Sequence, residues 1–276
     1  MLLVLNVNNT NTVIALYPFD GKHTGDLRAT WRISTRQAQT ADEYGILIRN
    51  LLGTEGVDST AISGIVIASV VPPIDWILRQ FCKRYFNQKP LFIEPGVKTG
   101  LPILTDSPGE VGADRVGNCV GAFHLYGGPC IVVDFGTATN FDVVSKSGEF
   151  LGGAIAPGMN VSAEALFARA ARLPRVEIKR PPKVIGTNTV DNLQIGLFYG
   201  HIGLVDGILA RMIDELGPET KCVATGGLAR LIAAESKYIS EVNDTLTLEG
   251  LRLIYERNQL ASARPHAHKT PAAQNS

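Results

Sequence analysis

The sequence has little cysteine and histidine and no net charge, and each shortage excludes a class of protein. Its four cysteines lie far apart and form no Cys-x-x-Cys pair, which predicts reduced, buried thiols rather than disulfides or metal ligands. Its five histidines include no helical pair flanking a glutamate, which argues against a histidine metal site. Lysine plus arginine equals aspartate plus glutamate at 26 each, so no basic field exists to attract nucleic acid.

Targeting signals and long apolar runs are also missing. The first residues, MLLVLNVNN, carry no basic start and too short an apolar run for a signal peptide. No later run approaches the length that spans a membrane. We therefore expect a cytoplasmic protein without membrane association, and the length of 276 residues suits about two domains.

The most informative stretch is 130–158, CIVVDFGTATNFDVVSKSGEFLGGAIAPG. A β-branched apolar run ends at Asp134, Gly136 permits a turn with Thr137 and Thr139 in it, and an apolar run resumes at Phe141. Backbone N–H groups in such a turn can bind phosphate oxygens while the carboxylate binds the accompanying cation. An ordinary hairpin with a surface aspartate is the alternative.

The N-terminus repeats this pattern. Residues 4–14, VLNVNNTNTVI, align without a gap on residues 132–142, VVDFGTATNFD, which places Asn6 opposite Asp134 and Asn8 opposite Gly136. The chain therefore resembles a duplicated unit, in which the first copy lacks one carboxylate and one glycine.

Periodicity and turn residues predict an α/β fold with mixed sheets. Strands are expected at 2–7, 12–19, 27–34, 63–71, 91–94, 130–133, 141–144 and 222–227, and helices at 40–53, 74–86, 113–123, 162–172 and 188–216, with helical segments to about 258. Residues 261–276 are small, polar and proline-containing, which predicts disorder.

A loop rich in proline and glycine, 95–115, joins the two halves and runs into the helix expected at 113–123. Asp114 and Arg115 then lie near a helix N-terminus, where an anion is favoured. Capping of the helix by Glu110 and Asp114 is the alternative explanation.

Seven segments together resemble the type III pantothenate kinase family. They are GADR (112–115), DFGTAT (134–139), GGAIAPG (152–158), ALFARAARLPRV (165–176), GTNTVDNLQIG (186–196), GLVDGI (203–208) and TGGLA (225–229), in the family's order. The resemblance runs from residue 1 to about 258. It implies two duplicated ribonuclease-H-like domains of the actin-like ATPase superfamily, here 1–117 with the first phosphate hairpin and 118–258 with the second hairpin and a dimer interface, followed by a disordered tail at 259–276.

The resemblance also implies a reaction, cofactors and partners. It implies transfer of the γ-phosphate of ATP to pantothenate, the first step of coenzyme A biosynthesis, by a homodimer that uses Mg²⁺ and a monovalent cation, K⁺ or NH₄⁺. Such a transfer needs positioning, charge neutralisation and a base for the incoming hydroxyl.

Residue roles carried over from the family are as follows. Asp114 is expected to be the catalytic base, and Asp134 is expected to bind the monovalent cation. Pantothenate is expected to contact Arg115, the backbone of Gly112 and Ala113, and Thr105. Thr189 is expected to reach pantothenate from the partner subunit. ATP is expected to contact the first hairpin (Asn6, Val7, Asn8, Asn9, Thr10, Asn11, Thr12 and Val13), Thr137, Gly226 and Gly227.

Several positions depart from the family pattern. The first hairpin usually reads Asp-x-Gly-Asn-Thr, but here Asn6 and Asn8 replace its aspartate and glycine, which removes a charge that orders magnesium. Thr105 stands where family members often have a tyrosine, Gly109 stands in place of a larger residue, and Asn140 stands where a threonine is common. These differences predict a substrate-binding wall of different shape.

Three functions are therefore considered. The first is an active pantothenate kinase with a divergent first hairpin, and the second is a weakened relative that serves as a ligand-binding or regulatory protein. The third is a superfamily kinase acting on acetate or a sugar, which is disfavoured because 276 residues leave little room for the insertions of those enzymes.

Overall fold

Two five-stranded sheets with the same strand order form the framework of the computed structural model, which describes residues 1–170 and 172–262. The first half contains β1 (Leu2–Val7), β2 (Asn11–Tyr17), β3 (Ala29–Ser34), α1 (Ala41–Thr54), η1 (Ser59–Ala61), β4 (Gly64–Ser69), η2 (Pro72–Ile74), α2 (Asp75–Phe86), β5 (Leu91–Phe92), η3 (Pro108–Glu110) and α3 (Ala113–Tyr126). The second half contains β6 (Cys130–Phe135), β7 (Ala138–Val144), β8 (Phe150–Pro157), α4 (Met159–Arg169), α5 (Thr189–Leu216), β9 (Lys221–Gly226), α6 (Ala229–Ala233), β10 (Glu241–Val242) and α7 (Leu246–Ser262).

The sheet topology confirms the duplication and the mixed sheets. The N-terminal sheet has the order β3-β2-β1-β4-β5, and the C-terminal sheet, read in the matching direction, has the order β8-β7-β6-β9-β10. Strands β1 and β6 therefore occupy the same central place. Each pairs antiparallel with the next strand and parallel with a later one.

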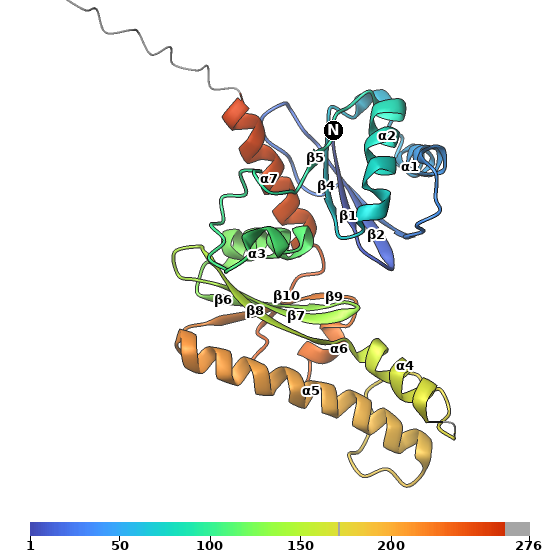
Figure 1. The fold of residues 1–276 in the computed structure, drawn as a ribbon, viewed down its shortest axis with the longest axis vertical. Coiled ribbons are helices and arrows are strands. Elements are labelled where there is room, and N and C mark those ends of the chain that lie inside the picture. The colour runs from blue at the N-terminus through green and yellow to red at the C-terminus, as the bar shows by residue number, and fades with distance from the viewer. Residues whose placement is uncertain (171, 263–276) are drawn as a thin grey trace, which may run out of the picture.

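Helices α3 and α7 lie between the two sheets (Figure 1). Alternation along β1 sends Leu3 and Leu5 toward α1 and α2, while Leu2 and Val4 pack with Leu251 of α7. On the other side, Cys119 of α3 packs against the C-terminal sheet. All four cysteines are buried and free, as expected.

The two middle helices cross at glycines. A Cβ on Gly250 of α7 would lie 1.8 Å from the carbonyl oxygen of Gly117, and one on Gly121 of α3 would lie 2.6 Å from that of Leu246. Helix α7 thus follows the C-terminal sheet in sequence but also packs on the N-terminal one. The division at residue 117 falls inside α3, so the shared helices join the two units.

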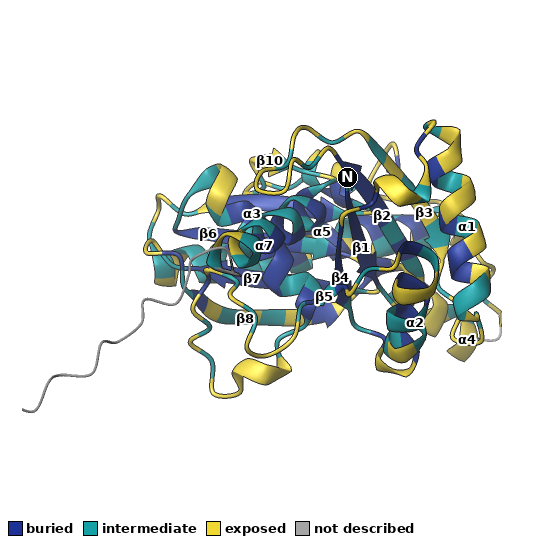
Figure 2. Cartoon of the chain, turned by 90° about the horizontal axis from the view of Figure 1, so that it is seen from above, coloured by how far each residue is buried: buried dark blue, intermediate teal, exposed yellow. Residues whose placement is uncertain are grey.

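Local sequence signals fixed most element starts. Helix α1 begins after Thr40, whose Oγ1 accepts a hydrogen bond from the Glu43 amide (3.3 Å), while the Glu43 carboxylate accepts one from the Thr40 amide (2.7 Å). The exposure of β3 alternates along its length, as expected of a strand with one face toward the core. Figure 2 shows β1 and β2 buried while α1 and α2 carry exposed outer faces.

Four sequence predictions differ from the structure. Strands β8 and β10 were not predicted, and α4 begins at Met159 rather than near residue 162. Residues 259–262, assigned to the tail, belong to α7, and the remainder of the predicted disordered tail lies outside the described residues. Strand β8 escapes a sequence pattern because it is glycine-rich, yet a Cβ on Gly153 would lie 1.7 Å from the Phe141 carbonyl oxygen, so close pairing with β7 requires glycine.

The expectation about apolar runs is also corrected. Helix α5, 28 residues long, is apolar enough to cross a membrane by length and composition. It was missed because glycines and a few charges interrupt its apolar residues. Its Phe198, Val205 and Leu209 pack against the C-terminal sheet.

Candidate active site

The predicted site residues gather where β1, β6 and α3 approach one another. Asn6 and Asp134 each stand one residue before the end of their central strand, and each pairs in parallel register with the neighbouring strand, at Ala68 and Thr225. The first turn of α3 carries Asp114 and Arg115. Ligands of open α/β sheets bind beyond such carboxyl strand ends.

The hairpins that follow β1 and β6 occupy equivalent places in the two sheets. Their residues do not match one to one in the ungapped alignment read from the sequence, because the two turns differ in length. The Asn8 amide donates to the Asn11 carbonyl, whereas the Gly136 amide donates to that of Ala138, each at 3.0 Å, so the second turn is one residue shorter. Asn6 still matches Asp134, but Thr12 now matches Thr139. Both threonines are buried, and β2 and β7 have the same burial pattern, which supports this register.

Asp114 is half-buried, and its surroundings favour the neutral acid. Burial raises the pKa of its carboxyl, while the Arg115 amide, which donates to Oδ1 at 2.8 Å, opposes the shift. A Cβ on Gly112 would lie 2.7 Å from the same oxygen, so a side chain there would displace the carboxylate. Gly112 is the N-cap residue, and Asp114 in the first turn accepts from the Arg115 amide, so the carboxylate also satisfies a free amide at the helix N-terminus.

Asp134 belongs to a hydrogen-bonded row that crosses from β6 to α7. The Asn118 amide group donates to Asp134 Oδ2 at 3.0 Å, and the Thr247 hydroxyl donates to Asn118 Oδ1 at 2.5 Å. Burial, together with the charges of Asp114 and Asp142, raises the pKa of Asp134 to about 6, against the lowering effect of the Asn118 hydrogen bond. Sequence reasoning missed Asn118 and Thr247; only the helical spacing of Asn118, four residues after Asp114, could have indicated the former.

A third carboxylate, Asp142, completes the cluster and was also missed. It is fully buried on β7, and Arg115 Nε and Nη2 donate to its Oδ1 at 2.8 and 2.5 Å. Burial raises its pKa to about 6, against the lowering effect of Arg115. The signal that could have found it was a charged residue inside the apolar run 141–144.

Glycines bring the backbone close to the cleft. Gly226 has φ of +93°, and a Cβ there would lie 2.6 Å from Asp134 Oδ1 and 2.7 Å from the Phe135 nitrogen. A Cβ on Gly158 would lie 2.3 Å from the carbonyl oxygen of Thr137, so the GGAIAPG segment supports the second turn. Gly227 has open space around it.

Several buried oxygens near the cleft have no hydrogen-bond partner among the described residues. They include Asn6 Oδ1, Asn8 Oδ1, Thr105 Oγ1 and Asp142 Oδ2. Buried polar atoms are normally paired, so these atoms are available to a ligand or its bound water. The two asparagine oxygens are also donors of the hard type that Mg²⁺ prefers, so the first hairpin fits a hydrated magnesium ion.

Other predicted residues lie differently. Val7 is buried in the core, so only its backbone is available to a ligand, and the Thr12 hydroxyl is paired with that of Thr35 at 2.8 Å. Asn9 and Thr10 are exposed at the turn. Thr189 is exposed at the start of α5, at the end far from α3 (Figure 1).

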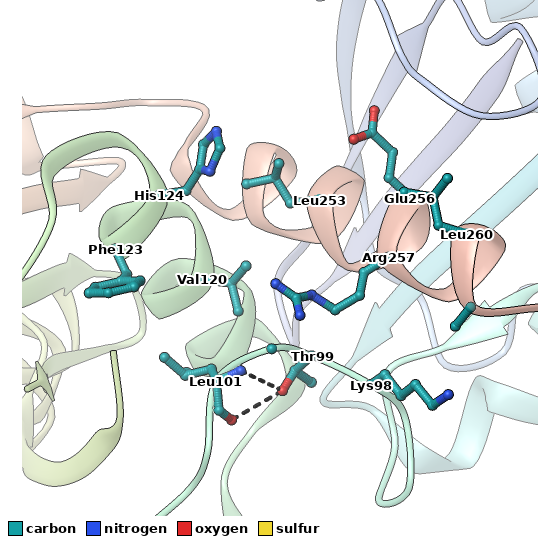
Figure 3. A pocket seen from close by; sticks show the side chains of 12 residues that line it. Lys98, Thr99, Leu101, Val120, Phe123, His124, Leu253, Glu256, Arg257 and Leu260 are labelled. Atoms are coloured by element: carbon teal, nitrogen blue, oxygen red, sulfur yellow. Dashed lines mark hydrogen bonds between the residues drawn. The ribbon is translucent and has the colours of Figure 1, made fainter. Parts of the chain in front are cut away.

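A cavity of about 750 Å³ lies outside the predicted site. It lies between the loop at Lys98–Leu101, the second half of α3 and the second half of α7 (Figure 3). Phe123 and His124 of α3 line it, more than two turns from Asp114. None of the predicted site residues lines it.

Comparison with known proteins decides the family. The model of the type III pantothenate kinase family matches residues 2–211. The chain belongs to the type III pantothenate kinase family. A relative from Acidobacterium capsulatum named type III pantothenate kinase is 77% identical over 258 residues, covering 93% of this chain and 94% of the relative. One of the same name from Koribacter versatilis is 60% identical, covering 97% and 99%.

Solved structures agree on the fold. An activator of 2-hydroxyisocaproyl-CoA dehydratase from Clostridium difficile, with bound ADPNP, has a TM-score of 0.55 at 13% identity, covering 94% of this chain and 96% of its own. A ROK family glucokinase from Streptomyces griseus has a TM-score of 0.52 at 12% identity, covering 91% and 97%. The actin-like ATPase fold predicted from the sequence is therefore confirmed.

Proposed function

We propose that the cleft of this pantothenate kinase family member transfers the γ-phosphoryl group of ATP to the primary hydroxyl of pantothenate, with Asp114 as the general base. The observation that carries the proposal is the geometry of Asp114. Its Oδ1 accepts from the Arg115 amide at 2.8 Å, and burial raises its pKa. A base works best when its pKa approaches the working pH.

The remaining roles follow from position. Arg115 and the Gly112–Ala113 backbone bind polar groups of pantothenate beside the base, and Thr105 forms part of the wall, since its methyl group lies beside Gly152 (a Cβ there would be 3.9 Å away). The hairpin from Asn6 to Val13, together with Thr137, Gly226 and Gly227, binds ATP. Asn6 and Asn8 face its hydrated Mg²⁺, which neutralises phosphate charge when bound.

Asp134 holds the monovalent cation, K⁺ or NH₄⁺. Its carboxylate lies among Asp114 and Asp142, and both neighbouring charges raise its pKa. A bound cation offsets that repulsion. Asn118 orients the carboxylate from α3, so the cation site and the base are carried by one helix and one strand.

The functional unit is a homodimer in the cytoplasm. Exposed apolar side chains gather on the segments around α4 and the start of α5: Ile155 (65% exposed), Leu166 (38%), Val184 (64%), Ile185 (82%) and Val190 (44%). We call these five residues the apolar face. Exposed apolar side chains of this kind mark an interaction site, and Thr189 directly precedes Val190 of the apolar face, so pairing through this face brings Thr189 to a second subunit.

A weakened, ligand-binding relative is the alternative, and Asn6 is the observation that favours it. The test is an ADP-release assay with pantothenate and MgATP, in potassium and then in sodium, with Asp114→Asn as the blank. We expect pantothenate-dependent turnover that needs potassium and falls by roughly 10²- to 10⁴-fold in the variant. Calorimetric binding of either substrate without turnover would refute the enzyme and leave the ligand-binding protein.

A further inference from the structure

The ion pair between Arg115 and Asp142 has an unusual geometry for its position. Two donors of the guanidinium, Nε and Nη2, converge on one carboxylate oxygen, Asp142 Oδ1, at 2.8 and 2.5 Å. No described residue binds Arg115 Nη1. The pair therefore fixes the plane of the guanidinium and leaves donors for a ligand.

The surroundings hold this guanidinium from a second side. Its central carbon lies 5.5 Å from the centre of the Phe150 ring. Asp142 itself is fixed, because it pairs across the sheet with Gly153, where β7 and β8 approach too closely for a Cβ. Arg115 is thus held between two strands of the C-terminal sheet, although it belongs to α3.

The pair is costly as a purely structural device. The side chain of Asp142 is fully buried, that of Arg115 is 18% exposed, and Asp142 Oδ2 has no hydrogen-bond donor among the described residues. A buried ion pair with an unpaired oxygen stabilises a fold less than apolar side chains of the same volume. Its place beside Asp114, whose charge acts on Asp142, indicates a role in the site.

We propose that Asp142 is a positioning residue, which orients the Arg115 guanidinium toward the acceptor substrate and so sets the affinity for pantothenate. The proposal rests on the proposed function of the cleft, because it assumes that Arg115 contacts pantothenate. It assigns Asp142 no contact with ATP. Loss of the clamp therefore affects acceptor binding and leaves nucleotide binding intact.

The first test is Asp142→Asn, which keeps the shape and one acceptor oxygen but removes the charge. We expect the KM for pantothenate to rise roughly 10- to 100-fold, with the KM for ATP within about twofold of wild type. The matched control is Asp42→Asn, which breaks an exposed Asp–Arg pair (2.8 Å to Arg84) between α1 and α2. An unchanged KM for pantothenate in folded Asp142→Asn would overturn the proposal.

The second test uses the double variant, in case the single one does not fold. Replacing both members of a buried pair by neutral groups avoids an isolated buried charge. We expect Asp142→Asn to change the KM for pantothenate by less than about twofold in an Arg115→Met background, because its effect passes through Arg115. A further large rise in that background would contradict a positioning role. Absence of pantothenate turnover in wild type would instead refute the proposed function.

Discussion

At the scale of single residues, the site is a cluster of three carboxylates that share little counter-charge. Asp114 and Asp142 raise the pKa of Asp134, Asp114 raises that of Asp142, and Arg115 is the one basic side chain among the described residues that forms an ion pair with any of the three. Such a cluster suits a site that receives cations and a proton. It also costs stability when the site has no ligands.

Asp134→Asn is expected to stabilise the ligand-free protein while abolishing potassium dependence. The pKa of Asp134 is about 6 in the folded protein against a usual value of 3.8, so folding favours the protonated acid. The contribution of Asp134 to the free energy of unfolding therefore falls as the pH rises from about 4 to 6, and this contribution is absent above pH 6. The variant should gain on the order of 1–3 kcal/mol at pH 7.5, and less than half of that at pH 4.5.

Urea unfolding of both proteins at the two pH values measures this difference. Asp26→Asn, at an exposed aspartate, is the control and should show no such pH dependence. A variant less stable than wild type at pH 7.5 would show that the hydrogen bond from Asn118 outweighs the buried charge.

At the scale of elements, the two hairpins have the same burial but different chemistry. The second offers a carboxylate at Asp134 and a glycine turn, and the first offers the neutral oxygens of Asn6 and Asn8 on a turn one residue longer. Neither Asn8 nor Gly136 is among the described residues with positive φ, so asparagine stands at position 8 without backbone strain.

Asn6→Asp tests whether the first hairpin lacks a charge that orders magnesium. Asn6 is 7% exposed, and its Oδ1 has no hydrogen-bond donor among the described residues. A carboxylate at this position would therefore be stabilised mainly by a bound metal ion. We expect kcat/KM for MgATP to rise about tenfold. Asn50→Asp, exposed on α1, is the control. Unchanged kinetics would mean that another group already orders the ion.

At the scale of the whole molecule, the apolar face stands apart from the cleft, and Thr189 lies in it rather than beside Asp114. Helix α5 contributes to the same end of the molecule, and much of it is apolar although only 33% of its most apolar window is buried. Both features are expected of a subunit whose partner covers this surface.

Ile185→Asp should therefore separate the subunits. Ile185 is 82% exposed in the single chain, and a charge in a paired apolar interface is unfavourable. We expect sedimentation to show a dimer for wild type and a monomer for the variant, with weaker pantothenate binding. Ile46→Asp, at a 56% exposed isoleucine on α1, is the control. A monomeric wild type would remove the proposed role of Thr189.

Local chemistry was the part of this protein that its sequence determined. The duplication, the capping of α1 by Thr40 and the alternation of β3 are encoded within a few residues, so each was predicted from the chain alone. The same holds for Asp114 and Asp134, because each ends or begins an element in a short motif. The family resemblance supplied their roles, and the family assignment is confirmed.

Contacts between distant segments were decided only by the tertiary structure. Asn118 meets Asp134 and Thr247 because α3 and α7 cross at glycines between the sheets, and Arg115 meets Asp142 because β7 lies beside that crossing. The difference in turn length between the two hairpins and the glycine-dependent pairing of β8 with β7 were also decided by the tertiary structure. Sequence patterns report which face of an element is apolar, whereas the approach of two backbones depends on every element packed around them.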